Sequence, residues 1–362
     1  MKIDTLINVL HSQFAKLTYP YLRARSKKCI DLKVKLVAIA KNESAYIPEW
    51  VYHHLYFGFD QIAIYYNGCS DNTLELLPFL PEDRVRFINA DSIFENTKGN
   101  PQLDIYRREF KYSRQQGYGH LMFLDLDEFW VPANLDNTIQ EYISALPYFD
   151  SLCFQWVNRI DEEIPFDSAI KERLKVEDAR QVKAIHKTFI TPGLMTPHNL
   201  IDNLLCRIME DGRAFKPGNG AQSVVANLTV PEKAFVLHRK YRSKKEYISL
   251  LGRGRPLARE KVVSSFKDNR NGYCDPEKGR QLTFDAVNYC KYNTFMSSKL
   301  ADFVSSSSYK LAKEHVLQRY CSVICDIKNA SKDELPILLK VLRNVDLKEV
   351  QQAFEEYKKK IA

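Results

Sequence analysis

Two aspartates, Asp125 and Asp127, follow an apolar run in the segment FLDLDEFW. Side chains alternate along a β-strand, so residues two positions apart are expected to point to the same face. Two carboxylates that converge in this way repel each other unless a cation or a proton lies between them. A hard divalent cation removes this cost, and it can also bridge two phosphates and neutralise a departing diphosphate. The pair therefore predicts a site for Mn²⁺ or Mg²⁺, with Glu128 as a structural hydrogen-bonding residue in preference to a further ligand. A pair of surface carboxylates that caps the next segment is the alternative.

A histidine and a basic run later in the chain could complete such a site. His238 follows the apolar run AFVL, and a neutral imidazole is a competent metal ligand. His238 is therefore a candidate metal ligand, and a purely structural role is the alternative. Arg and Lys side chains bind phosphate oxygens, which makes Arg242 and Lys245 candidates for holding a diphosphate. A solvated basic helix face is the alternative for this run.

Strand and helix patterns alternate over the first part of the chain and would position these residues. Short apolar runs rich in β-branched residues end in polar tails such as KNES and GCSDNT, and amphipathic segments lie between them. The expected strands span 34–40, 61–67, 84–90 and 120–129, and the expected helices span 45–59, 72–80 and 101–119. This alternation predicts an α/β domain with a mostly parallel sheet, whose ligands gather at the carboxyl ends of the strands.

The rest of the chain is less regular up to a helical end. Strands are expected at 151–157, 183–190 and 234–241, and an acidic segment at 160–173 is expected to begin as a loop and continue as a helix. Residues 300–362 read as helices, and the four serines at 305–308 read as a linker. The predicted organisation is a helical, basic lead-in at 1–32, a catalytic domain at 33–260 and a mainly helical region at 261–362.

Charge and cysteine usage narrow the class of protein. The net charge of +8 comes from clusters that are far apart in the sequence, which fits a phosphate site and a membrane-facing surface better than one nucleic-acid stripe. The eight cysteines are scattered without a C-x-x-C pair, as is typical of reduced thiols. No apolar run reaches the roughly 18–20 residues that span a bilayer. We therefore expect a cytoplasmic protein, peripheral on the inner face of the membrane, that does not bind nucleic acid.

Three segments together resemble a known family. KNESAYIPEWVYHHLYFGFDQIAIYYNGCSDNT, FLDLDEF and HRKYRSKKEYISLLGRGRP are similar to motifs of the family 2-type glycosyltransferases, in the branch close to glycosyltransferase family 92. The resemblance covers about residues 34–256, and it implies a glycosyltransferase-A (Rossmann-like) fold with a nucleotide-sugar donor and Mn²⁺ or Mg²⁺. By position, Asp125 and Asp127 match the metal motif of the family, and His238 matches a late histidine that completes the metal shell or contacts the diphosphate.

The same resemblance assigns the nucleotide end of the site. Asn42 and Glu43 would border the nucleotide, and Asn67 and Asp71 would lie near the base and ribose. Many family 2 enzymes have Asp where this chain has Asn67, so a carboxylate contact to the base or ribose does not carry over. Arg239 follows His238 where the family has Tyr, so the geometry of that loop does not carry over either.

The leading hypothesis from the sequence is transfer of a hexose from a uridine diphosphate sugar to a hydroxyl of a glycan or glycolipid. The resemblance implies inversion, which needs a base to deprotonate the acceptor hydroxyl; Asp161 and Glu162 follow a predicted strand and are the candidates. The pathway expected from the absence of a membrane span is synthesis of a surface polysaccharide or lipopolysaccharide. A nucleotidyl- or phosphotransferase with the same metal site and a non-catalytic basic binding module are the alternatives.

Overall fold

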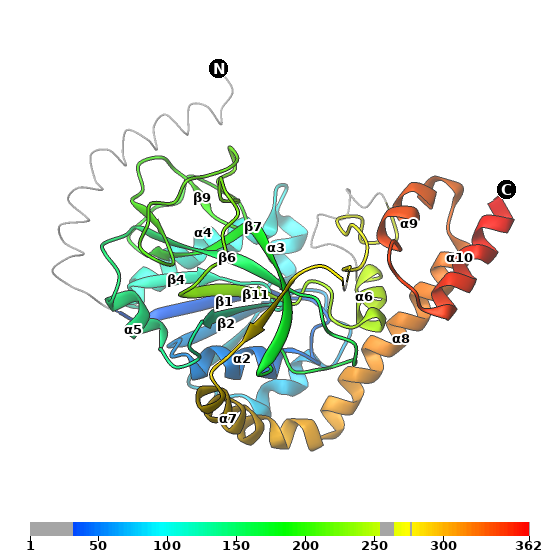
Figure 1. Cartoon of the computed structure of the whole chain (residues 1–362), viewed down its shortest axis with the longest axis horizontal. Helices are drawn as coiled ribbons and strands as arrows, with labels where there is room; N and C mark the ends of the chain where they lie inside the picture. The colour runs from blue at the N-terminus through cyan, green and yellow to red at the C-terminus, as the bar shows by residue number, and fades with distance from the viewer. Residues whose placement is uncertain (1–31, 254–263, 276, 362) are drawn as a thin grey trace.

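A computed structural model describes residues 32–253, 264–275 and 277–361 (Figure 1). The helix predicted within the lead-in lies outside these residues. The described chain builds one large mixed sheet with helices on both faces and a group of C-terminal helices beside it. The predicted fold class is confirmed: a mostly parallel α/β sheet flanked by helices, followed by a helical C-terminal region.

Four strands that run in the same direction form the first half of the sheet. They span Val34–Ala40 (β1), Gln61–Tyr66 (β2), Val85–Asn89 (β3) and His120–Phe123 (β4). Their order in the sheet is β3-β2-β1-β4, with parallel pairing throughout. The polar tails of these strands therefore meet at one edge of the sheet, as the sequence predicts.

The second half of the sheet mixes directions. Its strands are Glu128–Pro132 (β5), Ser151–Arg159 (β6), Arg173–Lys187 (β7) and Ala234–His238 (β11). The order continues from β4 as β7-β6-β11-β5; β7 runs antiparallel to β4 and β6, and β5 runs antiparallel to β11. Short strands extend it: Arg207–Met209 (β10) pairs with β6 and Arg280–Thr283 (β12) with β7, while Leu194–Met195 (β8) and Leu200–Ile201 (β9) form a separate hairpin.

Helices cover both faces of this sheet. They span Ile47–Tyr56 (α2), Asp91–Asn96 (α3), Pro101–Gln115 (α4), Ile139–Ser144 (α5), Lys244–Leu251 (α6), Ala286–Ser305 (α7), Ser307–Asn329 (α8), Leu335–Val341 (α9) and Lys348–Ile361 (α10). Side chains alternate along β1 and pack in two apolar layers, one on each face of the sheet. Leu36 and Ala38 pack in the cluster that contains α2, whereas Val37 packs in the cluster that contains α4. Burial on both faces explains why β1 reads as a continuous apolar run.

Local signals set the ends of α2 as expected. Pro48 lies in its first turn, where proline is tolerated, and Gly58 follows its end with a φ of +86°. A side chain at Gly58 would also collide with Gln140, so this position needs glycine for two reasons.

Three predicted elements differ in the structure. The segment predicted as a helix at 72–80 forms a 3₁₀ helix, Thr73–Phe79 (η1), which contains Pro78. The acidic segment at 160–173 contains no helix; it consists of turns and bends held by side-chain contacts to its neighbours, and β7 begins at its end. The serines at 305–308 are not a linker, because Ser306 alone separates two long helices and caps the second by accepting from the Tyr309 N–H.

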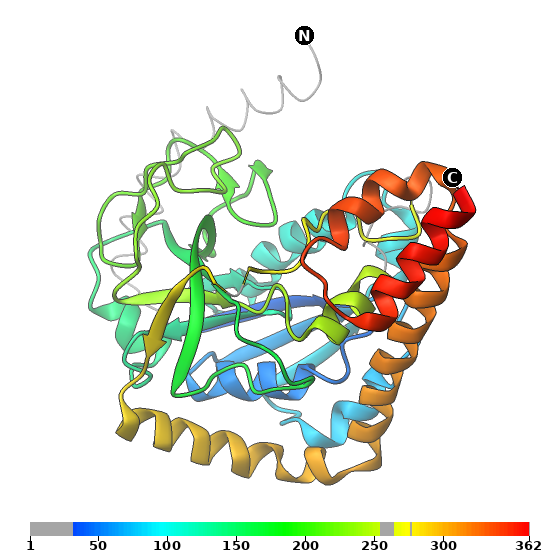
Figure 2. The ribbon, with the colours of Figure 1, turned by 45° about the vertical axis from the view of Figure 1, so that its right-hand side comes forward.

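The C-terminal helices build a core of their own. The described residues from α8, α9 and α10 pack with α6 and with the segment 264–274 in one buried cluster, separate from the two clusters under the sheet. Figure 2 shows α7 passing along one side of the sheet and α8 turning upward, with α9 and α10 packed beside it. Within the described residues, no helix combines the length and the apolar character needed to cross a bilayer.

Candidate active site

The two aspartates lie in a turn between β4 and β5, called here the aspartate turn (residues 125–127). The prediction of a single strand over 120–129 is wrong, because the chain leaves β4 at Phe123 and enters β5 only at Glu128. The Glu128 N–H donates to the Asp125 carbonyl at 2.9 Å, and the buried Glu128 carboxylate accepts the Asp125 N–H at 2.9 Å. Glu128 therefore has the structural role predicted for it, and this turn, not strand alternation, orients the aspartates.

A buried lysine neutralises one side of the turn. The Lys183 ammonium, which β7 brings under the turn, lies 3.0 Å from Asp125 Oδ2 and 3.0 Å from Glu128 Oε2. Burial alone would lower the pKa of Lys183, but Asp125 and Glu128 outweigh it and raise this pKa, so the side chain stays charged. The Asp125 side chain is 44% exposed, so solvent reaches it even though one of its oxygens pairs with Lys183.

The pairing of β5 with β11 brings His238 to the other aspartate. His238 stands opposite Glu128 in this ladder, and its Nε2 lies 3.6 Å from Asp127 Oδ2. The Arg239 N–H donates to the Asp127 carbonyl at 2.7 Å, which joins the end of β11 to the turn. Burial lowers the pKa of His238, against the effect of Asp127, so the imidazole is neutral and able to coordinate a metal.

Asp127 itself remains ionised. Burial alone would raise its pKa, but His238, Arg270 and Arg242 outweigh burial and bring this pKa below its usual range. The guanidinium of Arg270 lies 3.6 Å from Asp127 Oδ2. Both aspartates therefore present negative charge at the carboxyl end of β4.

Aromatic rings form the wall beside His238. The Trp156 ring lies 4.1 Å from the His238 ring and 5.1 Å from the His198 ring, measured between centroids. His198 Nδ1 lies 3.2 Å from the Val182 carbonyl, which can only accept, so Nδ1 carries the proton and Nε2 keeps its lone pair. Burial and the nearby Lys183 lower the pKa of His198 to about 4. Trp156 thus lies next to the predicted metal ligand His238.

The chemistry of these groups fits a divalent cation. Among the described residues, no hydrogen bond or ion pair ends on Oδ1 of Asp125 or Oδ1 of Asp127, and the buried His238 Nδ1 has no hydrogen-bond partner. The part of the chain that the structure describes holds no ready-made cluster of three or more His, Cys, Asp and Glu side chains. Mg²⁺ is commonly bound by one or two carboxylates together with substrate phosphates, which is the ligand set that this turn offers.

The predicted nucleotide-bordering residues come together at the carboxyl ends of β1 and β2. Asn42, with a φ of +55°, accepts the Ser70 N–H at 2.7 Å on its side-chain oxygen. Asp71 accepts the Ser44 N–H at 2.9 Å, and Asn67 donates to Asp91 at 3.3 Å. These bonds connect the loops that follow β1, β2 and β3 into one edge.

Glu43 pairs with two arginines. It is buried and forms ion pairs with Arg242, at 3.1 Å, and with Arg253. The Arg242 guanidinium also lies 3.4 Å from the centroid of the Tyr46 ring. Glu43 therefore positions two arginines at the edge of the site, and its role at the nucleotide stays a prediction.

The basic run after β11 does not form one surface. Arg239 points inward and pairs with Glu49, at 3.1 Å, and with Glu162. Lys244 pairs with Asp346 at 2.6 Å, and Lys245 is exposed, with its ammonium 5.9 Å from the Tyr320 ring. Of the two predicted diphosphate ligands, Arg242 is close enough to Asp127 to lower its pKa, whereas Lys245 is exposed on α6.

The two candidate bases make ion pairs away from the aspartate turn. Asp161 accepts from Arg159 Nε at 2.6 Å and from the Lys175 N–H at 2.9 Å, and its side chain is 27% exposed. Glu162 is buried and accepts from Arg239 Nε at 2.8 Å. The catalytic role of both residues stays a prediction.

Three residues at this site were not predicted from the sequence: Lys183, Lys267 and Arg270. Among them, only Lys183 has a local signal in the sequence, because it is a charged residue between Val182 and Ala184 at the start of a predicted strand. The others come from loops, whose positions depend on contacts that no local pattern encodes.

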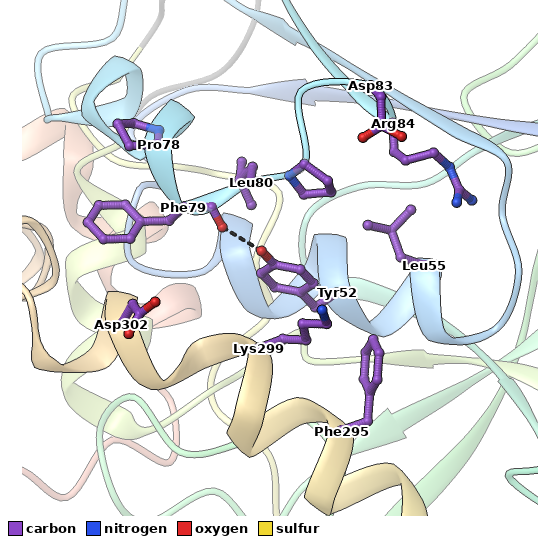
Figure 3. Close-up of a pocket in the computed structure, with 11 residues that line it drawn as sticks. Tyr52, Leu55, Pro78, Phe79, Leu80, Asp83, Arg84, Phe295, Lys299 and Asp302 are labelled. Carbon is purple, nitrogen blue, oxygen red and sulfur yellow. Dashed lines mark hydrogen bonds between the residues drawn. The ribbon is translucent and has the colours of Figure 1, made fainter.

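A separate cavity lies elsewhere on the molecule. It has a volume of about 530 Å³ and opens between α2, η1 and α7 (Figure 3). Tyr52 crosses it and donates to the Phe79 carbonyl at 2.6 Å, while Arg84 binds the Asp60 carbonyl just before β2 begins. This cavity is therefore at the amino ends of β2 and β3, opposite the aspartate turn.

Comparisons with known proteins identify a family that the chain is similar to. Residues 37–199 match the family model of glycosyltransferase family 92, and this range runs from within β1 through β4 and the aspartate turn. No curated protein sequence matches the chain. Among solved structures, the chain is similar to the crystal structure of HddC from Yersinia pseudotuberculosis, at 10% identity and a TM-score of 0.31, over 48% of this chain and 88% of that chain. Residues 37–199 thus carry the match to glycosyltransferase family 92, and this match implies that the protein is a glycosyltransferase.

Proposed function

We propose that the protein transfers a hexose from a uridine diphosphate sugar to a hydroxyl of a glycan or glycolipid, with Mn²⁺ or Mg²⁺ bound at the aspartate turn. The observation that carries this proposal is the aspartate turn at the carboxyl end of β4, where Asp127 lies 3.6 Å from His238, within the range that matches family 92. In sheets of this kind, ligands bind at that edge.

In this proposal Asp125 and Asp127 hold the cation and His238 completes its ligands. When bound, the cation would offset the negative charge that develops on the diphosphate as the bond to the sugar breaks. Lys183 keeps Asp125 oriented, and the Arg239 N–H keeps the Asp127 backbone in place. Trp156 would form an apolar platform beside the cation, as suits a sugar ring.

The nucleotide would lie along the loops that follow β1 and β2. Asn42, Asn67 and Asp71 line this edge. Asn42 accepts the Asp71 N–H and Asn67 donates to Asp91, and these bonds make the edge rigid before a ligand arrives. Arg242 would face the diphosphate from the side of α6. For the acceptor proton, we propose Asp161 in preference to Glu162, because solvent reaches Asp161.

Pathway and location are part of the proposal. We place the enzyme in the cytoplasm, in contact with the inner face of the membrane, in the synthesis of a surface polysaccharide or lipopolysaccharide. The wide separation of its basic clusters supports a surface that faces anionic lipid as well as a phosphate site.

A screen of nucleotide-sugars tests this function. The protein is incubated with each donor, with Mn²⁺ or with EDTA, and donor hydrolysis and melting temperature are followed. A uridine diphosphate sugar should be hydrolysed slowly and should raise the melting temperature with Mn²⁺, since a ligand at a hundredfold excess over Kd adds about 2.7 kcal/mol. Equal stabilisation by all nucleotide-sugars, or none by any, would contradict the proposal.

A further inference from the structure

The segment that follows α6 carries cations toward the aspartate turn. Lys267 is buried as a residue, with 7% of its surface exposed, and its ammonium makes no hydrogen bond or ion pair to another residue that the structure describes. Burial, Arg253 and Arg270 lower the pKa of Lys267 well below its usual value, against the effect of Asp127 and Asp125. Lys267 is therefore close enough to the two aspartates and to two other cations to interact with them electrostatically.

The guanidinium of Arg270 lacks some of its hydrogen-bond partners. Its guanidinium lies 3.6 Å from Asp127, longer than a hydrogen bond, and its buried Nε has no partner among the described residues. Arg242 Nε and Arg319 Nη1 are buried without a partner in the same way. Buried N–H groups of charged side chains are costly to leave unpaired, so several of them around one site indicate a missing acceptor.

The protein holds these cations in place from the C-terminal helices. The Lys267 N–H donates to the Leu251 carbonyl at 2.8 Å, at the end of α6. From the other side, Lys340 on α9 donates to the Asp268 carbonyl at 2.7 Å, and the Tyr273 N–H donates to the Arg343 carbonyl at 2.9 Å. The position of the segment is thus fixed by contacts that do not involve its charged groups.

The end of α6 is fixed as well. Arg319 on α8 donates to the Ser249 carbonyl at 3.0 Å, and a side chain at Gly252 would come within 2.5 Å of Val323. This close packing of α8 on α6 places Arg253, the next residue, where it pairs with Glu43.

We infer that Arg253, Lys267 and Arg270, called here the basic cluster, bind the diphosphate of the donor beside the aspartate turn. Arg offers a planar fork and Lys a point charge, and a diphosphate supplies acceptor oxygens for all three. The inference rests on the proposed function for the identity of the donor. It assigns the diphosphate to residues outside the family 92 domain, on a segment that the C-terminal helices position.

Calorimetry with inorganic pyrophosphate, uridine diphosphate and uridine tests this inference. Each ligand is titrated into the wild-type chain and into Lys267→Gln and Arg270→Gln, once with Mn²⁺ and once with EDTA. Pyrophosphate and uridine diphosphate should bind each variant about ten- to hundredfold more weakly than the wild type, because one charged hydrogen-bonding group is lost. The affinity for uridine should not change.

Lys278→Gln is the matched control. Its side chain is 71% exposed and pairs with Asp275, so this variant removes the same charge from the same region without touching the cluster. Its affinities should equal those of the wild type. If Lys278→Gln weakens pyrophosphate as much as Lys267→Gln does, the effect is one of net charge and the inference is wrong.

A stability measurement separates a binding role from a structural one. Lys267→Met removes a buried cation that neighbouring cations repel, so its melting temperature without ligand should equal or exceed that of the wild type. Its stabilisation by pyrophosphate should nevertheless be lost. A lower melting temperature together with unchanged pyrophosphate affinity would show that Lys267 is structural and would overturn the inference.

The two proposals fail in different ways. If uridine diphosphate binds the wild type, the Lys267 variants and the Arg270 variants equally, the inference is wrong and the proposed function stands. If pyrophosphate binding depends on the cluster but no nucleoside diphosphate binds, the cluster stands and the nucleotide-sugar proposal fails. If the wild type does not bind pyrophosphate with Mn²⁺ or with EDTA, the cluster is not a diphosphate site.

Discussion

The two aspartates of the turn differ in what balances their charge. Asp125 has a permanent counterion in Lys183, whereas Asp127 faces a neutral histidine and the longer contact to Arg270. Asp125 is also the more exposed of the two, at 44% against 14%. These differences predict that changes at the two positions, and at their partners, have distinct effects.

The variant Asp127→Asn should lower sugar transfer by about a hundred- to a thousandfold, because it removes charge that would hold the cation. Its melting temperature should change little, since the bond from the Arg239 N–H to the backbone carbonyl remains. Turnover at saturating Mn²⁺ and thermal unfolding measure the two effects. Asp136→Asn, at a carboxylate that is 57% exposed, is the control with unchanged turnover. Normal turnover of Asp127→Asn would rule out its metal role.

Removing Lys183 should affect stability as well as activity. Burial raises the pKa of Glu128 well above its usual value, against the effect of Lys183, so in Lys183→Met the carboxyl loses its ion pair and takes up a proton. The expected loss at neutral pH is at most about 3–5 kcal/mol of unfolding free energy. Adding Glu128→Gln to this variant should restore most of the loss, because the buried charge is gone and the amide oxygen can still accept the Asp125 N–H. Urea unfolding of the two single variants and the double variant forms a cycle. Additive losses in this cycle would mean that the two side chains do not interact.

At the scale of secondary structure, α2 holds the sheet through histidines that carry no charge. His53 Nε2 lies 2.8 Å from the Trp130 carbonyl, so it donates, and Nδ1 accepts from the Tyr292 hydroxyl at 3.0 Å. One histidine thus joins α2 to β5 and to α7. The next residue, His54, accepts the Trp130 N–H at 3.2 Å. Two adjacent buried imidazoles make this helix sensitive to acid.

Stability should therefore fall in mild acid. Burial lowers the pKa of His53 to about 3, so its contribution is present above pH 6.5 and is lost as the pH falls from there toward 3. Over this range each such histidine adds a slope of about 1.4 kcal/mol per pH unit. His53→Gln keeps a donor for the Trp130 carbonyl but does not titrate, so its unfolding free energy should depend less on pH by that amount. Urea unfolding between pH 7 and pH 4 measures it; parallel curves for the two proteins would contradict the assignment.

At the scale of the whole molecule, the C-terminal helices and the sheet have separate cores that meet at the site. The clusters under the sheet contain β1 to β7 and α2, α4 and α7, and the C-terminal cluster contains α6, α8, α9 and α10 with the segment 264–274. Figure 2 shows the C-terminal helices packed together beside the sheet. The basic cluster comes from the second core and the aspartates from the first.

A cavity made by mutation in the C-terminal core should therefore change binding at the site. Leu338 on α9 is fully buried, so Leu338→Ala should cost about 2–5 kcal/mol and loosen the segment that α9 holds. Pyrophosphate affinity should fall with it, and hydrogen exchange of residues 264–274 should accelerate. Leu339→Ala is the matched control, because the Leu339 side chain is 56% exposed. Its unfolding free energy should change by no more than about 0.5 kcal/mol. Unchanged exchange and affinity in Leu338→Ala would show that the helices do not support the site.

The sequence by itself determined the parts of this protein that local pattern encodes. The strands β1, β2 and β3, the proline and glycine at the ends of α2, and the position of Asp125 and Asp127 after a buried strand all follow from residues close in the chain. His238 at the end of β11 belongs with them. The reason is that burial on both faces of a parallel strand requires a short apolar run, which is visible in one dimension.

Only the tertiary structure decided how those residues meet and what balances their charge. The turn at Asp125 to Asp127 exists because β5 leaves to pair with β11, a partner more than a hundred residues away in the chain. The pairing of β7 with β4 places Lys183 beneath Asp125, and the packing of the C-terminal helices brings Lys267 and Arg270 to the turn. Ion pairs and loop positions depend on contacts between distant segments, so no periodicity or spacing in the chain predicts them.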